Sequence, residues 1–148
     1  MARKKTYRKF KQGIFIPKNR KKFIGESAQY RSGLELKFFR FCDDNPNVVK
    51  WGSENVVIPY ISPLDNKTHR YFVDNYVEIK EGSVITKYLI EIKPFSQTSA
   101  PTTKYRKKAH LLYEQKAFAV NTSKWRAAKE YCSKHRLKFL IITEKDLK

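Results

Sequence analysis

The six residues Tyr88–Lys93 read Tyr-Leu-Ile-Glu-Ile-Lys, and we expect them to form the strand that organises this chain. Successive side chains of a strand point to opposite faces, so the tyrosine and the two isoleucines share a wholly apolar face. Glu91 and Lys93 share the other face, roughly 6–7 Å apart along the strand. Pro94 ends the strand, because it has no N–H to donate. The pattern indicates either a catalytic acid and lysine or an ordinary ion pair on an edge strand.

The composition predicts a single folded domain with a polyanionic partner. The chain has 148 residues, of which 41% are hydrophobic, enough to bury a sizeable core. Its formal net charge is +18, from 32 Lys and Arg against 14 Asp and Glu, which favours nucleic acid over a membrane. It has no apolar run of about 18 residues, so no membrane span is expected. Cys42 and Cys132 are too few for a disulfide framework and have no zinc-ligand spacing.

Residues 1–24 are expected to form a basic, flexible arm, and residues 25–148 the folded domain. The arm contains many lysines and arginines and no acid, and such runs repel themselves until they meet phosphate. Its interleaved aromatic residues are suited to stacking on bases or docking on the domain. We expect the arm to bind DNA or a protein partner, and a solvated tail is the alternative. Its predicted DNA contacts are Arg3, Lys4, Lys5, Arg8 and Lys9.

The folded part is expected to begin with a helix over about 32–43. Ser32 is a suitable N-cap and Glu35 follows three residues later, as in a capping box. Apolar residues then recur at helical spacing. Glu35 therefore either caps the helix or directs a carboxylate toward a neighbouring sheet.

Two strands are expected between this helix and Tyr88–Lys93. An apolar run over 56–61 is interrupted at Pro59, and a run over 70–79 is rich in β-forming residues. With Tyr88–Lys93 they would make an antiparallel meander. Asp74 lies inside the second run among aromatic and apolar residues, where an acid is costly unless it is paired or bound to a cation.

The last third predicts helices followed by a strand. Helical spacing covers about 109–117 and again 125–135, with Thr122 or Ser123 as the cap of the second helix. The run 137–143 is apolar enough to be buried on both faces, and a helical crossover makes it parallel to a neighbour. The element order αβββαβ predicts an α/β (α+β) fold with a mixed sheet flanked by helices.

The loop after Pro94 predicts further contacts with DNA. It is polar and rich in chain breakers, and it leads to a compact basic patch. Gln97 in this loop is a candidate contact to DNA or to a metal-bound water, and an ordinary loop amide is equally consistent with the sequence. The predicted phosphate contacts of the patch are Lys104, Arg106, Lys107 and Lys108.

Four residues make a candidate site on these elements. Asp74 and Glu91 on adjacent strands are suited to share Mg²⁺ through oxygen ligands. Lys93 would orient or help to deprotonate the attacking water, or neutralise the phosphate. Glu35 would complete the metal shell or hold a metal-bound water. Glu54 is either a more distant acid of this site or a solvent-facing residue.

An acid on the first helix, an Asp on the second strand and Glu-x-Lys on the third resemble the PD-(D/E)xK nuclease superfamily. Val73 departs from the pattern, because Pro stands at that position in the name. The sequence more closely resembles the head completion nucleases of T4-type tailed phages, and more distantly the TnsA-like transposon endonucleases. The segments that carry the resemblance are 30–35, 51–54, 57–60, 71–74 and 90–94.

This resemblance implies a restriction-endonuclease-like fold and a Mg²⁺-dependent DNA endonuclease, with Mn²⁺ as a substitute. It implies Glu35, Asp74, Glu91 and Lys93 as catalytic residues, the three acids also binding metal. The implied substrate is DNA, as double-stranded ends or branches, cut before tail attachment. The implied partners are phage capsid or portal proteins, in the virion and host cytoplasm, with a transient dimer as one way to cut both strands. The alternatives are a non-catalytic DNA-binding capsid or portal-completion protein on the same fold, and a nuclease that cleaves transposon ends.

Overall fold

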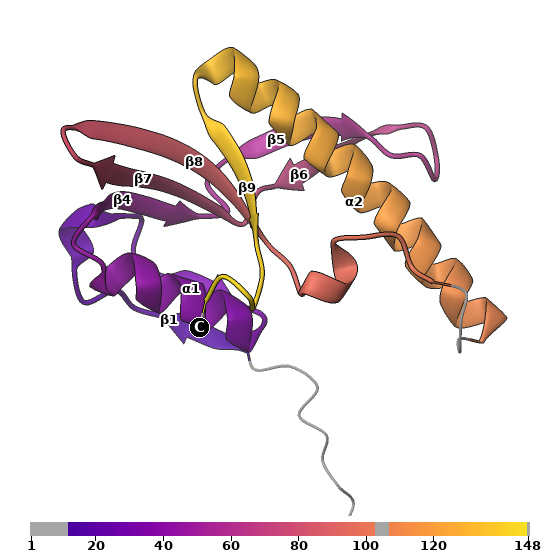
Figure 1. Cartoon of the computed structure of the whole chain (residues 1–148), viewed down its shortest axis with the longest axis horizontal. Coiled ribbons are helices and arrows are strands. Elements are labelled where there is room, and N and C mark those ends of the chain that lie inside the picture. Colours follow the sequence, from indigo (N-terminus) through magenta and orange to yellow (C-terminus); the bar gives the residue numbers. More distant parts are fainter. Residues whose placement is uncertain (1–11, 103–106, 148) are drawn as a thin grey trace, which may run out of the picture.

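The computed structural model describes residues 12–102 and 107–147, which are built around a mixed five-stranded sheet in the order β2-β4-β7-β8-β9 (Figure 1). The elements are β1 (Gly13–Phe15), η1 (Arg20–Lys22), β2 (Phe23–Ile24), β3 (Ala28–Tyr30), α1 (Gly33–Asp44), β4 (Val48–Ser53), β5 (Val57–Ile61), β6 (Thr68–Phe72), β7 (Asn75–Glu81), β8 (Val84–Ile92), η2 (Phe95–Gln97), α2 (Lys108–His135) and β9 (Lys138–Ile142). β7 pairs antiparallel with β4 and β8, whereas β9 runs parallel to β8. The predicted αβββαβ core is confirmed by α1, β4, β7, β8, α2 and β9.

α1 begins where the sequence predicts. The Ser32 side chain accepts a hydrogen bond from the Glu35 N–H at 3.1 Å, which satisfies one of the free N–H groups of the first turn. The Glu35 carboxylate in turn accepts from the Arg31 N–H at 2.7 Å, so the reciprocal bond of the capping box reaches one residue further back. The cap fixes the first turn of α1 beside the central sheet.

The sheet face that contacts α1 is a dry aromatic core. Trp51 of β4 has no exposed surface, and its ring lies 4.6 Å from the ring of Phe23 and 5.5 Å from that of Phe39. Ile90 and Ile92 of β8 join the same cluster, as the alternation of that strand predicts. This face therefore carries most of the large buried side chains.

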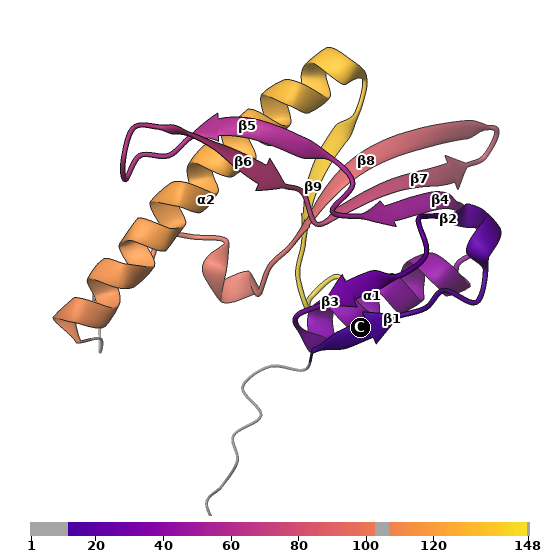
Figure 2. The same ribbon diagram turned by 180° about the vertical axis from the view of Figure 1, so that it is seen from behind.

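The other face of the sheet packs against α2 and a separate β5–β6 hairpin. Figure 2 shows the hairpin lying beside the C-terminal half of α2, above the central sheet. Their shared cluster includes Tyr71, Leu89, Ala128 and Cys132. Both cysteines of the chain are buried and free. None of the helices in the described ranges is long and apolar enough to cross a membrane.

The predicted strand over 70–79 is wrong in one respect, because the chain leaves one sheet and enters another at residues 73–74. β6 pairs only with β5, and β7 pairs with β4 and β8. The Val73 N–H bonds to the Val56 carbonyl and the Asp74 carbonyl accepts from the Glu54 N–H, both at 3.0 Å. The expected meander over 56–61, 70–79 and Tyr88–Lys93 is corrected accordingly: β4, not β5, is the sheet partner of β7.

The predicted boundary between an arm at 1–24 and a domain from 25 also needs correction. β1 pairs with β3, β2 pairs with β4, and the backbone N–H groups of Lys18 and Asn19 bond to the buried Asp43 carboxylate at 3.0 and 3.1 Å. Residues 13–24 are therefore part of the fold. Phe23 of this segment packs into the core, Lys18 and Lys21 are exposed, and the Lys22 amine donates to the Asn45 carbonyl at 2.9 Å.

Two further expectations for the C-terminal third are wrong. The helices expected over 109–117 and 125–135 are one continuous helix, α2, and the Thr122 hydroxyl donates to the Phe118 carbonyl inside it. The Thr122 hydroxyl is therefore bonded within the helix, and no new helix begins there. β9 is not buried on both faces, since Leu140 is 42% exposed.

Candidate active site

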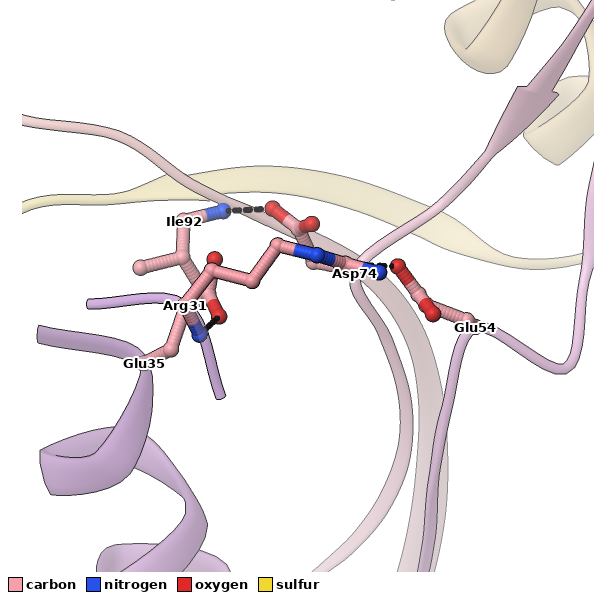
Figure 3. A network of polar contacts seen from close by, with 5 residues as sticks. All are labelled: Arg31, Glu35, Glu54, Asp74 and Ile92. Carbon is pink, nitrogen blue, oxygen red and sulfur yellow. Dashed lines mark hydrogen bonds and ion pairs between the residues drawn. The ribbon is translucent and has the colours of Figure 1, made fainter. Parts of the chain in front are cut away.

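Asp74 lies between β6 and β7, where the chain leaves one sheet and enters the other. Its carbonyl accepts from the residue after β4, as described above, and its carboxylate accepts from the Ile92 N–H of β8 at 2.7 Å. Figure 3 shows this bond between the Ile92 amide and the Asp74 carboxylate. Asp74 is thereby held against the C-terminal end of β8, next to the Glu-x-Lys sequence.

Glu91 is buried, with 5% of its surface exposed, and it is held from two sides. One carboxylate oxygen accepts a hydrogen bond from the Tyr71 hydroxyl, and the other lies 3.6 Å from the Lys93 amine. The Lys124 amine of α2 lies 5.6 Å from the centre of the Tyr71 ring and 5.7 Å from that of Tyr60. A buried carboxylate needs such partners, because burial alone disfavours its charge.

The pKa values of Asp74 and Glu91 depend on their burial and on the charged groups around them. Burial raises the pKa of Asp74 to about 8, and the neighbouring carboxylates of Glu91 and Glu35 push it the same way, whereas the Ile92 N–H and Lys93 oppose the shift. Burial likewise raises the pKa of Glu91, against the Tyr71 hydroxyl, Lys93 and Lys124. Two carboxylates in one partly dry site cannot both be charged at low cost unless a cation joins them.

Glu35 and Arg31 complete one side of this cluster (Figure 3). The first turn of α1 brings Glu35 to the same small cleft as Asp74, and its charge there raises the pKa of Asp74. Arg31 extends past Asp74 and ion-pairs with Glu54 at 2.7 Å. A small cleft is lined by all four of these residues. Glu54 is thus neither free in solvent nor beside Glu91, but the partner of an arginine at the rim.

The structure brings together Glu35, Asp74, Glu91 and Lys93 as the sequence predicts, and their chemical roles stay predictions. Among residues 12–102 and 107–147, no three His, Cys, Asp or Glu side chains are arranged so that they could hold a metal ion on their own. The predicted ligand set of Glu35, Asp74 and Glu91 therefore does not form such a group, and binding of a cation by Asp74 and Glu91 alone stays a prediction. Mg²⁺ characteristically takes one or two carboxylates and completes its shell with water and phosphate oxygens, so a pair is sufficient.

Most of the predicted DNA contacts fall outside the described residues: Arg3, Lys4, Lys5, Arg8, Lys9, Lys104 and Arg106. Lys107 and Lys108 are exposed at the start of α2, which projects away from the central sheet (Figure 1). Gln97 ends η2 and lines a groove that also contains Lys93. Gln97 is thus close to the acid cluster, whereas Lys107 and Lys108 are set apart from it.

Sequence reasoning missed the roles of Tyr71 and Lys124. Tyr71 lies in the other sheet from Glu91, so no spacing along the chain relates the two. Lys124 did leave a signal, since it falls at i+4 from Val120 and i−4 from Ala128, in the middle of an apolar stripe that packs on the hairpin. A lysine in such a stripe indicates a buried anionic or aromatic partner.

Comparison with known proteins relates this site to nucleases. Residues 45–144 match the family described as TnsA-like endonuclease N terminal. The chain is 38% identical over 146 residues to the head completion nuclease of Enterobacteria phage T4, in an alignment that covers 92% of this chain and 93% of the relative. The family match spans Asp74, Glu91 and Lys93.

Proposed function

The chain belongs to the TnsA-like endonuclease N-terminal family, and on this premise we propose that it is a Mg²⁺-dependent endonuclease that hydrolyses phosphodiester bonds in DNA. The observation that carries the proposal is the Asp74 carboxylate, held on the Ile92 N–H next to the buried Glu91, whose ion-pair partner is Lys93. The net charge of +18 supports DNA as the substrate, because a carboxylate cluster repels phosphate unless cations surround it.

The proposed cation would be held by Asp74 and Glu91, with Glu35 close enough to bind one of its waters. A bound Mg²⁺ polarises the scissile phosphate and makes a neighbouring water more acidic. Mn²⁺ has similar ligand preferences and should substitute. Burial and the Glu91 carboxylate raise the pKa of Asp74, and a cation between the two carboxylates would offset the effect of Glu91.

The remaining side chains would position and balance this pair. Lys93, whose amine lies 3.6 Å from Glu91, is placed to orient the attacking water, to help to deprotonate it or to neutralise the phosphate. Tyr71 would fix one oxygen of Glu91, and the other, which now lies near the Lys93 amine, would turn toward a cation. Lys124, over the Tyr71 ring, keeps a positive charge on the buried side of the carboxylate.

The biological setting follows from the relative rather than from the geometry. The matched protein of phage T4 is a head completion nuclease, and we propose the same stage of assembly for this chain. DNA ends or branches would be cut before tail attachment, in the virion or the host cytoplasm, with capsid or portal proteins as partners. Basic residues before residue 12 and around the start of α2 would hold the DNA. A transient dimer would bring a second copy of the site to the other strand.

Two other functions are kept as alternatives. A DNA-binding capsid or portal-completion protein would use the positive charge without the chemistry. The observation against it is the acid pair of the buried Glu91 and the half-buried Asp74, which costs stability and has no use in a protein that only binds phosphate. A nuclease of transposon ends would use the same site, and its distinguishing property would be a sequence-specific cut.

Cleavage of supercoiled and branched DNA in Mg²⁺ or EDTA tests the proposal. Wild-type protein should cut in Mg²⁺ and not in EDTA, and Asp74→Ala or Glu91→Ala should lower the rate by more than about 100-fold, since removal of residues that only support a metal ligand already costs about 10–100-fold. Glu130→Gln, at an exposed ion pair on α2, is the matched control and should cut normally. Cleavage that survives both alanine substitutions at the wild-type rate would refute the assignment of the site.

A further inference from the structure

A groove of about 410 Å³ lies between the segment after β8 and the N-terminal half of α2, and we call it the η2–α2 groove. In Figure 2 the chain leaves β8, passes through η2 and runs beside this part of α2. Its walls include Lys93 and Gln97 on one side and His110, Tyr113, Phe118 and Asn121 on the other. No role has so far been given to it.

The η2–α2 groove opens beside the acid cluster. Lys93 lines the groove, and its amine lies 3.6 Å from the Glu91 carboxylate. A molecule in the groove therefore reaches the atoms proposed to cut DNA within the length of one side chain. The groove is placed to receive the part of the substrate that adjoins the scissile phosphate.

The groove walls combine flat rings with hydrogen-bonding amides. Tyr113 is 72% exposed, so its ring is open to a ligand, and Phe118 lies further along α2. Gln97 and Asn121 each offer a donor and an acceptor. A nucleobase presents the complementary surfaces, a π-face for stacking and an edge for hydrogen bonds, but only when it is unpaired.

Size and charge favour a single strand over a duplex. A volume of about 410 Å³ falls in the range of roughly 300–1,000 Å³ that holds small ligands, which suits a single nucleotide rather than a double helix. Lys107, Lys108 and Lys116 are exposed on the same part of α2, where they can meet phosphates. Glu114 in the wall lies 2.7 Å from His110 Nε2, which is its partner on α2.

We propose that the η2–α2 groove binds an unpaired nucleotide of the DNA strand next to the scissile phosphate. The substrate is then DNA with a single-stranded end or branch, and Gln97 and Tyr113 contact its base. This inference rests on the proposed function for the position of the cut, but not for the binding of the strand.

Binding of labelled oligo(dT) to the full-length chain in EDTA tests the groove without any cleavage. An abasic strand of the same length supplies the phosphates without the bases. Wild-type protein should bind oligo(dT) more tightly than the abasic strand. Tyr113→Ala should weaken binding of oligo(dT) by about fivefold or more, as expected when one stacked base is lost. Its binding of the abasic strand should stay unchanged.

Two neighbours on α2 outside the groove provide matched controls. Leu112→Ala removes an exposed apolar side chain next to Tyr113, and Gln115→Ala removes an exposed amide to match Gln97→Ala. Both controls should bind oligo(dT) as the wild type does. The proposal is overturned if Tyr113→Ala and Leu112→Ala bind oligo(dT) equally well, or if the wild type does not distinguish oligo(dT) from the abasic strand.

Cleavage in Mg²⁺ separates this inference from the proposed function. If wild-type protein cuts DNA while Tyr113→Ala and Gln97→Ala bind oligo(dT) normally, the groove is wrong and the nuclease stands. If no DNA is cut, the nuclease is wrong, and the binding in EDTA still decides the groove.

Discussion

The two faces of β8 have opposite chemistry, although they belong to one strand of nine residues. One face packs Ile90 and Ile92 against the aromatic cluster around Trp51. On the other face the buried Leu89 is followed by Glu91, which lies near Asp74. The first face stabilises the fold by burying apolar surface. The second destabilises it, because two acids are held together away from water. The rigid apolar packing on the first face of the strand holds the two acids in position despite this cost.

The apolar face should show the largest effect on stability. Trp51→Ala would leave a large cavity among Phe15, Phe23 and Phe39, and we expect the free energy of unfolding to fall by about 3–5 kcal/mol. Chemical denaturation measures this change. Leu112→Ala at an exposed site should cost less than about 1 kcal/mol. Equal losses in the two variants would mean that Trp51 is not central to the core.

On the acidic face, a substitution should raise the free energy of unfolding instead of lowering it. Asp74→Asn keeps an acceptor for the Ile92 N–H and removes the acid, so we expect it to unfold with a higher free energy than the wild type at pH 8.5, by about 1 kcal/mol or more. The folded protein holds this proton up to pH about 8, whereas an unfolded Asp loses it near 3.8. Wild-type stability due to this group is therefore complete below pH 4 and declines as pH rises toward 8.

Denaturation of both proteins at pH 5 and pH 8.5 measures this difference. The advantage of Asp74→Asn should be larger at pH 8.5. An advantage that is the same at both pH values would show that the acid is not held at a cost.

A smaller effect, on the rate of cleavage, is expected at Tyr71, which joins the β5–β6 hairpin to Glu91 of the central sheet. Tyr71→Phe removes the hydrogen bond to Glu91 but keeps the ring in its cluster, and we expect roughly tenfold slower cleavage with little change in DNA affinity. Single-turnover rates and binding in EDTA separate the two quantities. Lys124→Met should act in the same direction and Lys124→Arg should restore the rate. An unchanged rate for Tyr71→Phe would leave Glu91 positioned by Lys93 alone.

The sequence predicts the two faces of β8 well, because strict alternation over six residues determines which side chains share a face. It predicts α1 equally well, since Ser32 and Glu35 are local signals for a helix start. Both features depend only on neighbours in the chain. The fold class follows from the order of such elements.

The sequence could not show where the chain changes sheets at Asp74. Residues 70–79 are rich in β-forming residues, although Asp74 and Asn75 are not β-formers. The break between β6 and β7 depends on hydrogen bonds to Glu54 and Val56, which belong to an earlier part of the chain. The contact of Tyr71 and Lys124 with the site follows from that break, so it was missed as well. Thr122 resembles a helix cap in the sequence, yet α2, which packs on the hairpin, continues through it without a break. Tertiary contacts decide each of these features, and local propensity does not contain them.

Thermal unfolding with and without Mg²⁺ at pH 8 tests most directly whether Asp74 and Glu91 form a cation site. A ligand that binds only the folded state stabilises it by about 2.7 kcal/mol at 100 times its Kd. We predict that Mg²⁺ raises the Tm of the wild-type protein, more at pH 8 than at pH 6 because the carboxylates must lose their protons. The rise should be absent in Asp74→Asn and Glu91→Gln. An equal rise in wild type and both variants would contradict the account.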